Sequence, residues 1–183
     1  MKKLIVLAAA FALLSGCSAA ENSSGSTAGS VQTSAPESSA GQTERQIQAD
    51  YPAYDTLQAL EDQSDLILRC SFAKREGTEH EGTPYTRVTV KVKEVYQGDA
   101  KNGEDLSFLQ MGTNEEEKNP VICNAYIPMQ TDQDYVLFLT KSGDEYFMPS
   151  PAQSCYLWAD TDQALQPALD SGIALSLKVQ DLR

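Results

Sequence analysis

The sequence predicts a mainly β domain, a small antiparallel barrel with a short N-terminal helix, and a two-sheet β-sandwich is the alternative. Aliphatic and aromatic residues occur in short clusters separated by polar turns, which predicts several strands and few helices. Residues 85–96 alternate between apolar and polar side chains until the pattern shifts by one residue at Val95, as a β-bulge that bends a barrel strand would shift it. Residues 51–183 also provide enough chain for a single domain with one core.

The first elements follow from the spacing of apolar residues. Apolar side chains at positions 54, 57 and 60 mark one face of a short helix over residues 54–62. The apolar run 66–72 predicts a strand, and its alternation places Cys70 on the core face as a free, packed thiol. The charged stretch 74–84 predicts a loop, which leads into the half-buried strand at 85–96.

The later elements depend on turn residues and hydropathy. Turn residues at 97–103 connect that strand to a hairpin partner over residues 106–110. The segment 135–139 is the most apolar part of the mature chain, so it predicts a central strand. We also expect short strands at 121–127, 146–148 and 155–158, a helix at 163–169 that Pro167 interrupts, and a weak strand at 173–179.

The N-terminus predicts export and attachment to a membrane by lipid. An apolar run of 11 residues follows Lys2 and Lys3, well short of the ~20 that a membrane-spanning helix needs. The run ends in Leu-Ser-Gly before Cys17, which resembles the lipobox of bacterial lipoproteins. The resemblance implies removal of residues 1–16 as a signal peptide, a diacylglyceryl group on the Cys17 sulfur, and residence on the outer face of the cytoplasmic membrane. The alternative is an ordinary secretory signal cleaved near residues 18–20.

The next segment predicts a tether, and the mature chain is acidic. Residues 18–50 contain no aromatic side chain, so we expect residues 17–50 to form a flexible linker before the domain at 51–183. Without residues 1–16 the chain has 12 basic and 26 acidic residues, a formal charge of −14. Such a chain is repelled by phosphate backbones, so nucleic acid is not an expected partner.

Three cysteines remain after Cys17, an odd number for an oxidising compartment. The simplest arrangement is one disulfide and one buried thiol. Because Cys123 and Cys155 stand near the ends of apolar segments and beside turn-like sequence, we predict a disulfide between them and leave Cys70 free.

No motif predicts a reaction, a metal or a cofactor. His80 is the sole histidine, and the chain has neither a His-Glu-x-x-His zinc motif nor a Gly-x-Ser-x-Gly nucleophile turn. We therefore expect His80 to be a solvated loop residue and assign no catalytic residue. The closely spaced aspartates are expected in turns rather than around calcium: Asp132, Asp134, Asp160 and Asp162.

One aromatic pair and two loops could serve recognition. Tyr156 and Trp158 alternate across Leu157, so in a strand both rings face the same side. Packing in the core is the favoured interpretation, and an exposed ligand-binding platform for a sugar or a peptide side chain is the alternative. The charged loops at 74–84 and 111–120 could carry binding residues or act only as solubilising connections.

Three segments carry a resemblance to a known kind of domain: residues 64–68, 88–98 and 134–139. Their succession resembles a domain of uncharacterised surface lipoproteins of Gram-positive bacteria, and more remotely the OB-like barrel of netrin modules and tissue inhibitors of metalloproteases. The resemblance implies an OB-like barrel over residues 51–160. Protease inhibition does not carry over, because those inhibitors act through a free N-terminal cysteine and Cys17 is expected to be lipidated.

These observations lead to one expected function and two alternatives. We expect a lipid-anchored, non-enzymatic extracytoplasmic domain that binds a protein or another component of the cell envelope. The first alternative is a small-ligand or metal-binding lipoprotein accessory to a transporter. The second alternative is an enzyme that uses a pair of carboxylates, but the distance between two carboxylates in the fold cannot be read from the sequence.

Overall fold

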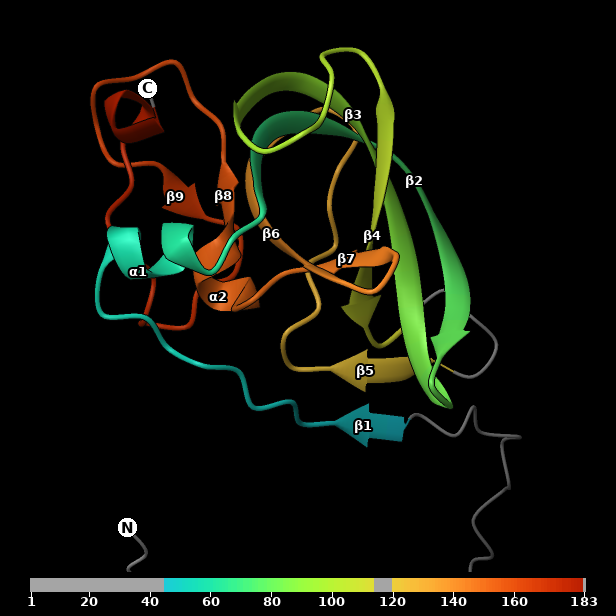
Figure 1. Ribbon diagram of the computed structural model, residues 1–183. Helices are drawn as coiled ribbons and strands as arrows, with labels where there is room; N and C mark the ends of the chain where they lie inside the picture. The colour runs from blue at the N-terminus through green and yellow to red at the C-terminus, as the bar shows by residue number, and fades with distance from the viewer. Residues whose placement is uncertain (1–44, 114–119, 183) are drawn as a thin grey trace, which may run out of the picture. The chain divides into compact units, whose positions relative to one another are not determined.

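The computed structural model describes residues 45–113 and 120–182, so the signal peptide and Cys17 lie outside the described residues. Within these residues the chain is mainly β, as predicted (Figure 1). No helix in the described part is long and apolar enough to cross a membrane. The elements in chain order are β1 (Arg45–Ile47), α1 (Leu57–Asp62), β2 (Leu66–His80), β3 (Thr83–Gln97), β4 (Asp105–Met111), β5 (Val121–Cys123), β6 (Asp134–Ser142), β7 (Glu145–Phe147), α2 (Pro151–Ser154), β8 (Cys155–Leu157), β9 (Gln166–Pro167) and the 3-10 helix η1 (Val179–Leu182).

Seven strands form one sheet in the order β2-β3-β4-β7-β6-β8-β9. The pairings are antiparallel except between β4 and β7, where Leu109 lies opposite Phe147 in a parallel contact. Strand β2 pairs with β3 along one edge and with β6 along the other. Strands β1 and β5 pair in parallel as a separate two-stranded sheet (Figure 1).

The β2–β3 hairpin is much longer than predicted, and the prediction of a loop at 74–84 is wrong. Strand β2 continues to His80, and the chain reverses at Glu81 and Gly82, which both have positive φ (49° and 76°), as in a type I′ turn. Most side chains between residues 73 and 80 are exposed or half-buried, so backbone pairing with β3 stabilises this arm without an apolar pattern. The bulge predicted near Val95 is confirmed, because the register of β2 and β3 shifts between Ile67 and Leu68, and Leu68 pairs with Val95.

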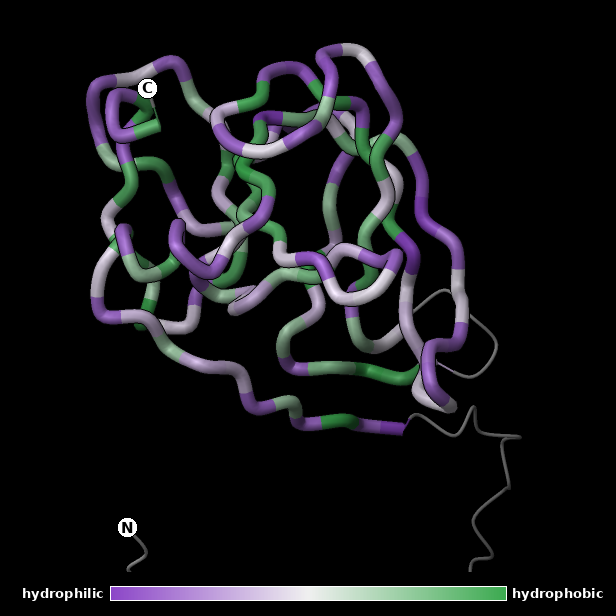
Figure 2. Tube along the Cα trace, viewed as in Figure 1, coloured by the Kyte–Doolittle hydropathy of each residue, from purple (hydrophilic) through white to green (hydrophobic). Residues whose placement is uncertain are grey.

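The core consists of two clusters on opposite faces of β2 and β6. The first contains alternate residues of these strands, Leu66, Leu68, Cys70, Tyr135, Leu137 and Leu139. The second contains the residues between them and side chains from α1 and the C-terminal segment, Leu60, Ile67, Val136, Phe138, Leu165, Leu177 and Leu182. Strand β6 is therefore buried on both faces, which confirms the predicted central strand, and Cys70 lies on the predicted core face. Figure 2 shows hydrophobic residues gathered along the inner strands.

The two ends of the described chain differ from the sequence predictions. Strand β1 begins at Arg45, inside the predicted linker, and residues 45–50 are attached to β5 and the residue after it, for example by the bond from Ala49 N to Asn124 Oδ1 (2.9 Å). The predictions of a helix at 163–169 and a strand at 173–179 are wrong. Pro167 instead lies in the two-residue strand β9, because proline interrupts a helix, and Leu165 N donates to Leu177 O (2.7 Å).

Candidate functional site

The two predicted recognition aromatics do not form one exposed platform. Tyr156 is fully buried in the second core cluster, and its hydroxyl donates to Leu175 O at 3.1 Å. Trp158 is half-buried at the edge of the same cluster. Core packing therefore describes Tyr156, and only Trp158 reaches the surface.

The predicted disulfide is absent. Cys70, Cys123 and Cys155 are free thiols, and all three are buried. Cys123 lies on β5 in the small sheet, whereas Cys155 lies with Cys70 in the first core cluster. Both cysteines stand near the ends of apolar segments, but the sequence does not show that these two segments lie in different parts of the fold. Burial raises the pKa of the Cys70 and Cys155 thiols, which disfavours the reactive thiolate.

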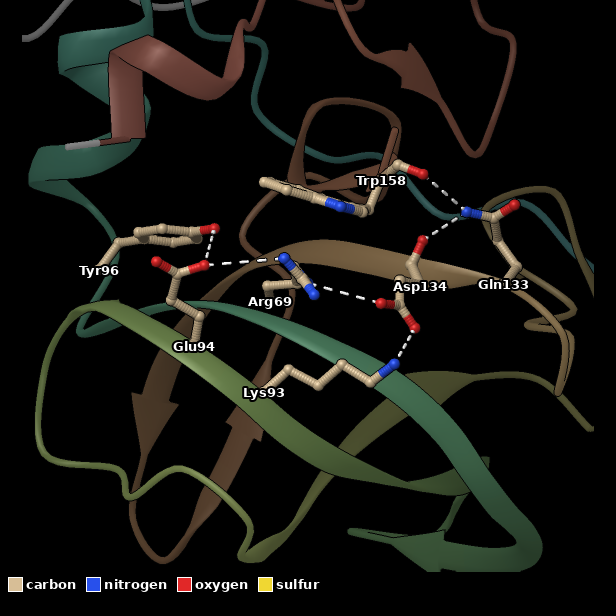
Figure 3. A network of polar contacts seen from close by, with 7 residues as sticks. All are labelled: Arg69, Lys93, Glu94, Tyr96, Gln133, Asp134 and Trp158. Atoms are coloured by element: carbon tan, nitrogen blue, oxygen red, sulfur yellow. Dashed lines mark hydrogen bonds and ion pairs between the residues drawn. The ribbon is translucent and has the colours of Figure 1, made fainter. Parts of the chain in front are cut away.

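Trp158 is part of a polar network that joins side chains of β2, β3 and β6 to the end of β8 (Figure 3). The Arg69 guanidinium carbon lies 4.4 Å from the centre of the Trp158 ring, within the range of a cation–π contact. Arg69 Nε lies 3.5 Å from Asp134 Oδ2, and its Nη1 lies 3.8 Å from Glu94 Oε2. The guanidinium therefore lies against one face of the indole ring and between two carboxylates.

The other contacts balance this network internally. Lys93 Nζ lies 2.6 Å from Asp134 Oδ1, so two cations face two anions. Gln133 Nε2 donates to the backbone oxygens of Asp134 (2.7 Å) and Trp158 (3.1 Å), which ties the start of β6 to the end of β8. Asp134 is therefore an ion-pair residue at the start of β6 and not a turn aspartate. Because the charges neutralise one another, the network is better suited to joining strands than to attracting a charged ligand.

A second candidate surface is a small cavity of about 100 Å³, which we call the aromatic pocket. Tyr85 on β3 and Phe147 on β7 stand at its wall with their ring centres 6.1 Å apart and their planes at 78°. Strand β4 brings them together, because Met111 lies opposite Tyr85 and Leu109 lies opposite Phe147. The pocket is lined by Tyr51, Tyr85, Leu109, Gln110, Met111, Ala125, Phe147, Met148 and Pro151.

His80 packs against this wall, so the expectation of a solvated loop histidine is wrong. Its ring centre lies 5.7 Å from that of Tyr85 and 5.5 Å from that of Phe147. His80 lies there because it is the last residue of β2 and pairs with Thr83 at the start of β3, two residues before Tyr85. The three rings together form an aromatic cluster beside the turn of the β2–β3 hairpin.

Tyr51 and Gln110 complete the pocket with neutral groups. Burial raises the pKa of Tyr51 to about 12, so its hydroxyl stays protonated at neutral pH. The Gln110 amide is already satisfied, since its Oε1 accepts from Ile127 N (2.9 Å) and its Nε2 donates to Ile127 O (3.2 Å). The pocket thus offers aromatic and apolar surface without a charge.

Sequence patterns missed this pocket, although one signal for it was present. Tyr85 lies on the polar face of the alternating strand, in the same parity as Arg87 and Lys91. An aromatic ring on the outward face of a strand is a candidate contact residue. Nothing comparable marked Tyr51 or Phe147, because their positions depend on how distant segments pack.

Two broader depressions, of about 420 and 670 Å³, lie beside strand β1. One follows β1 and β5, and the other extends from Arg45 toward the outer part of the β2–β3 hairpin. Both depressions are open troughs, too shallow to surround a small molecule. Within residues 45–113 and 120–182, no three His, Cys, Asp or Glu side chains gather where a metal ion could bind.

Comparison with known proteins gives no relative: no protein-family model matches the chain, and no curated protein sequence matches it. The candidate site therefore has to be judged by its own chemistry.

Proposed function

We propose that the chain is a lipid-anchored, non-enzymatic recognition domain, attached through Cys17 to the outer face of the cytoplasmic membrane. Its aromatic pocket receives an apolar group of a protein or of another cell-envelope component. The observation that carries this proposal is the convergence of Tyr51, Tyr85 and Phe147 from three separate segments on one outward-facing pocket. Aromatic side chains of this kind are the usual anchors of recognition surfaces.

The strand pairings support an OB-like barrel as the scaffold. They lead from β2 through β3, β4, β7 and β6 and return to β2, with β4 and β7 parallel. OB-folds bind ligands with the loops of their first and last hairpins. Here the corresponding hairpins are β2–β3 and β6–β7, and they carry His80 and Phe147 of the aromatic cluster.

The size of the pocket favours a macromolecular partner over a carried small molecule. Sites for drug-sized ligands and cofactors occupy about 300–1,000 Å³ and bury most of the ligand. A cavity of about 100 Å³ accommodates one apolar side chain or a group of similar size. Such a group belongs naturally to a larger partner that also contacts the open troughs beside β1.

Two buried groups are unsuited to act as nucleophiles. Burial raises the pKa of Tyr51 and of the Cys155 thiol, so both groups are held in their neutral forms. A phenol or thiol that acts as a nucleophile requires the opposite shift or an adjacent proton acceptor.

Lipid attachment is tested by metabolic labelling of cells with an alkyne-bearing fatty acid. The natural chain should acquire the label and fractionate with membranes, and Cys17→Ala should lose the label. Labelling of Cys17→Ala to the natural level would contradict the anchor.

Recognition is tested with the lipidated full chain and solubilised envelopes of the cells that encode it. Phe147→Leu keeps an apolar side chain but removes the ring, and we expect about tenfold weaker capture of the envelope component. Trp158→Leu is the matched control, because it removes a half-buried ring from the other candidate surface. Weaker capture with Trp158→Leu and unchanged capture with Phe147→Leu would overturn the assignment to the aromatic pocket.

A further inference from the structure

The outer half of β2 presents an open sheet edge (Figure 1). Strand β6 pairs with β2 only from Leu66 to Ser71, whereas β2 continues to His80 along its other partner, β3. Within the described residues, no backbone bond reaches residues 72–80 from any segment except β3. An edge of this kind offers its backbone N–H and C=O groups to an added strand.

The turn of the hairpin decides which backbone groups this edge offers. In a two-residue hairpin the pair that flanks the turn, here His80 and Thr83, exchanges both bonds, and the direction of these groups then alternates along the strand. Glu79 therefore directs its backbone groups outward. This agrees with its position opposite Pro84, which has no N–H and whose oxygen accepts from Gly112 N (3.0 Å) on the far side of β3.

Three residues turn their N–H and C=O groups toward the open edge in this way: Arg75, Gly77 and Glu79. The register of β2 and β3 does not shift between Lys74 and His80, so the alternation holds along this stretch. Gly77 and Glu79 are exposed, and Gly77 has no side chain to keep a neighbouring strand away. A strand added here can bond all three residues without disturbing the hairpin.

The charges along the edge indicate which strand fits it. Arg75 lies on the half nearer β6, and Glu79 lies on the half nearer the turn. Glu76, between them, is already paired with Lys74 of its own chain (2.6 Å). In an antiparallel pair of two β2 strands, Arg75 of each copy therefore lies opposite Glu79 of the other, an arrangement that stabilises a sheet.

The alternation also selects the register. Outward-facing residues must meet one another, and a two-fold axis at Gly77 satisfies this with about six backbone bonds. A slip of two residues in one direction brings Glu76 opposite its own copy, and like charges opposite each other destabilise a pair. A slip in the other direction brings Arg75 opposite Glu81, which lies in the turn with φ 49°. We propose that this edge joins two copies of the chain through an antiparallel β2–β2 pair centred on Gly77.

Arg75 keeps its present contacts in this pair. Its Nη2 donates to Met129 O (2.6 Å), and its guanidinium carbon lies 4.7 Å from the centre of the Phe72 ring. These contacts hold the guanidinium in place, and its other N–H groups are available to Glu79 of the second copy.

The pairing itself uses neither the lipid anchor nor the aromatic pocket. The interface is small, so association in dilute solution is weak. Its consequence for recognition rests on the proposed function: two copies tethered to one membrane meet at a raised effective concentration, and their dimer carries two aromatic pockets.

Disulfide trapping tests the register directly. Gly77→Cys places two thiols across the two-fold axis, where opposite Cα atoms lie about 5.5 Å apart, within reach of a disulfide. Ala73→Cys is the matched control, an exposed position of the same strand whose two copies lie about 27 Å apart in this register. Intact cells that produce the full chain are treated briefly with the oxidant diamide, and the initial rate of dimer formation is measured by non-reducing electrophoresis.

Gly77→Cys should form the dimer at least tenfold faster than either Ala73→Cys or the natural chain. The natural chain sets the background, because its described cysteines are buried. Equal rates for Gly77→Cys and Ala73→Cys would indicate random encounters and overturn the proposal. A Gly77→Cys chain that remains monomeric, or that links to a different protein, would also overturn it.

Charge variants in the Gly77→Cys chain test the pairing of Arg75 with Glu79. Adding Glu79→Lys should slow dimer formation at least tenfold, because it places like charges opposite each other twice. Asp99→Lys makes the same change in net charge at the far end of β3 and should leave the rate within twofold. Equal effects of Glu79→Lys and Asp99→Lys would contradict this register.

The exchanged pair provides a rescue. Arg75→Glu combined with Glu79→Lys restores opposite charges and should recover at least half of the rate lost with Glu79→Lys alone. No recovery in a chain with the natural urea midpoint would reject the proposed register. Phe147→Leu lies outside the interface and should leave the linking rate within twofold while weakening envelope capture, so failure of either proposal is recognised separately.

Discussion

Gly98 should be far less tolerant of a side chain than Gly103, although the two glycines have nearly the same φ angle. Gly98 has φ +91° and Gly103 has φ +87°, a region that costs an L-residue about 1–2 kcal/mol. A Cβ on Gly98 would collide with the backbone oxygen of Asp65 and lie 3.1 Å from Leu66 Cδ1. A Cβ on Gly103 would have no atom within 4 Å.

The magnitudes follow from this difference. At both sites alanine reduces the entropy of the unfolded chain, which offsets about 0.4–1 kcal/mol of the strain. Gly103→Ala should therefore lower the free energy of unfolding by about 1 kcal/mol or less. Gly98→Ala should lower it by about 2–4 kcal/mol, because overpacking adds about 1–3 kcal/mol and the displaced backbone of Asp65 leads directly into Leu66, a core residue paired with β6.

The assay is urea unfolding of the two variants and the natural chain, followed by circular dichroism. The comparison cancels the shared cost of positive φ and leaves the collision. Equal losses for the two variants, within about 0.5 kcal/mol, would refute the close approach of β3's end to the start of β2.

Two further predictions concern the buried thiols and one ion pair. A thiol reagent should label Cys70, Cys123 and Cys155 in the denatured, unreduced protein. The same reagent should react slowly with the native protein, because all three thiols are buried. Labelling of only one cysteine after denaturation would show that the other two form a disulfide. Arg87 donates two bonds to Glu145 (2.6 and 2.7 Å), so Glu145→Gln should lower the free energy of unfolding near pH 7 by about 0.5–1 kcal/mol. The Arg87 hydrogen bonds lower the folded-state pKa of Glu145, so the pair stabilises the fold above the unfolded pKa of about 4.3, and the difference between natural chain and variant should disappear as pH falls through the lower folded value. An unchanged difference at about pH 3 would contradict this account.

Alternation of side chains allowed much of the central sheet to be predicted. The strand expected at 85–96 is β3, and the one at 135–139 is the middle of β6, because each buries at least one face and a period of two is visible locally. The same rule missed the outer half of β2, where pairing with β3 holds polar residues in a strand. The rule also predicted regular secondary structure in the C-terminal segment, where Leu165 and Leu177 are buried although their backbone is neither helix nor strand.

Local patterns in the sequence were enough to predict the inner strands, the face on which Cys70 packs and the bulge near Val95. The separation of Cys123 from Cys155, and the meeting of Tyr51, Tyr85 and Phe147 at one pocket, were visible only in the folded chain. The difference lies in the range of the interactions. Local periodicity sets the side of a strand on which a residue lies, whereas the neighbours of that side depend on strand order and on contacts between distant segments.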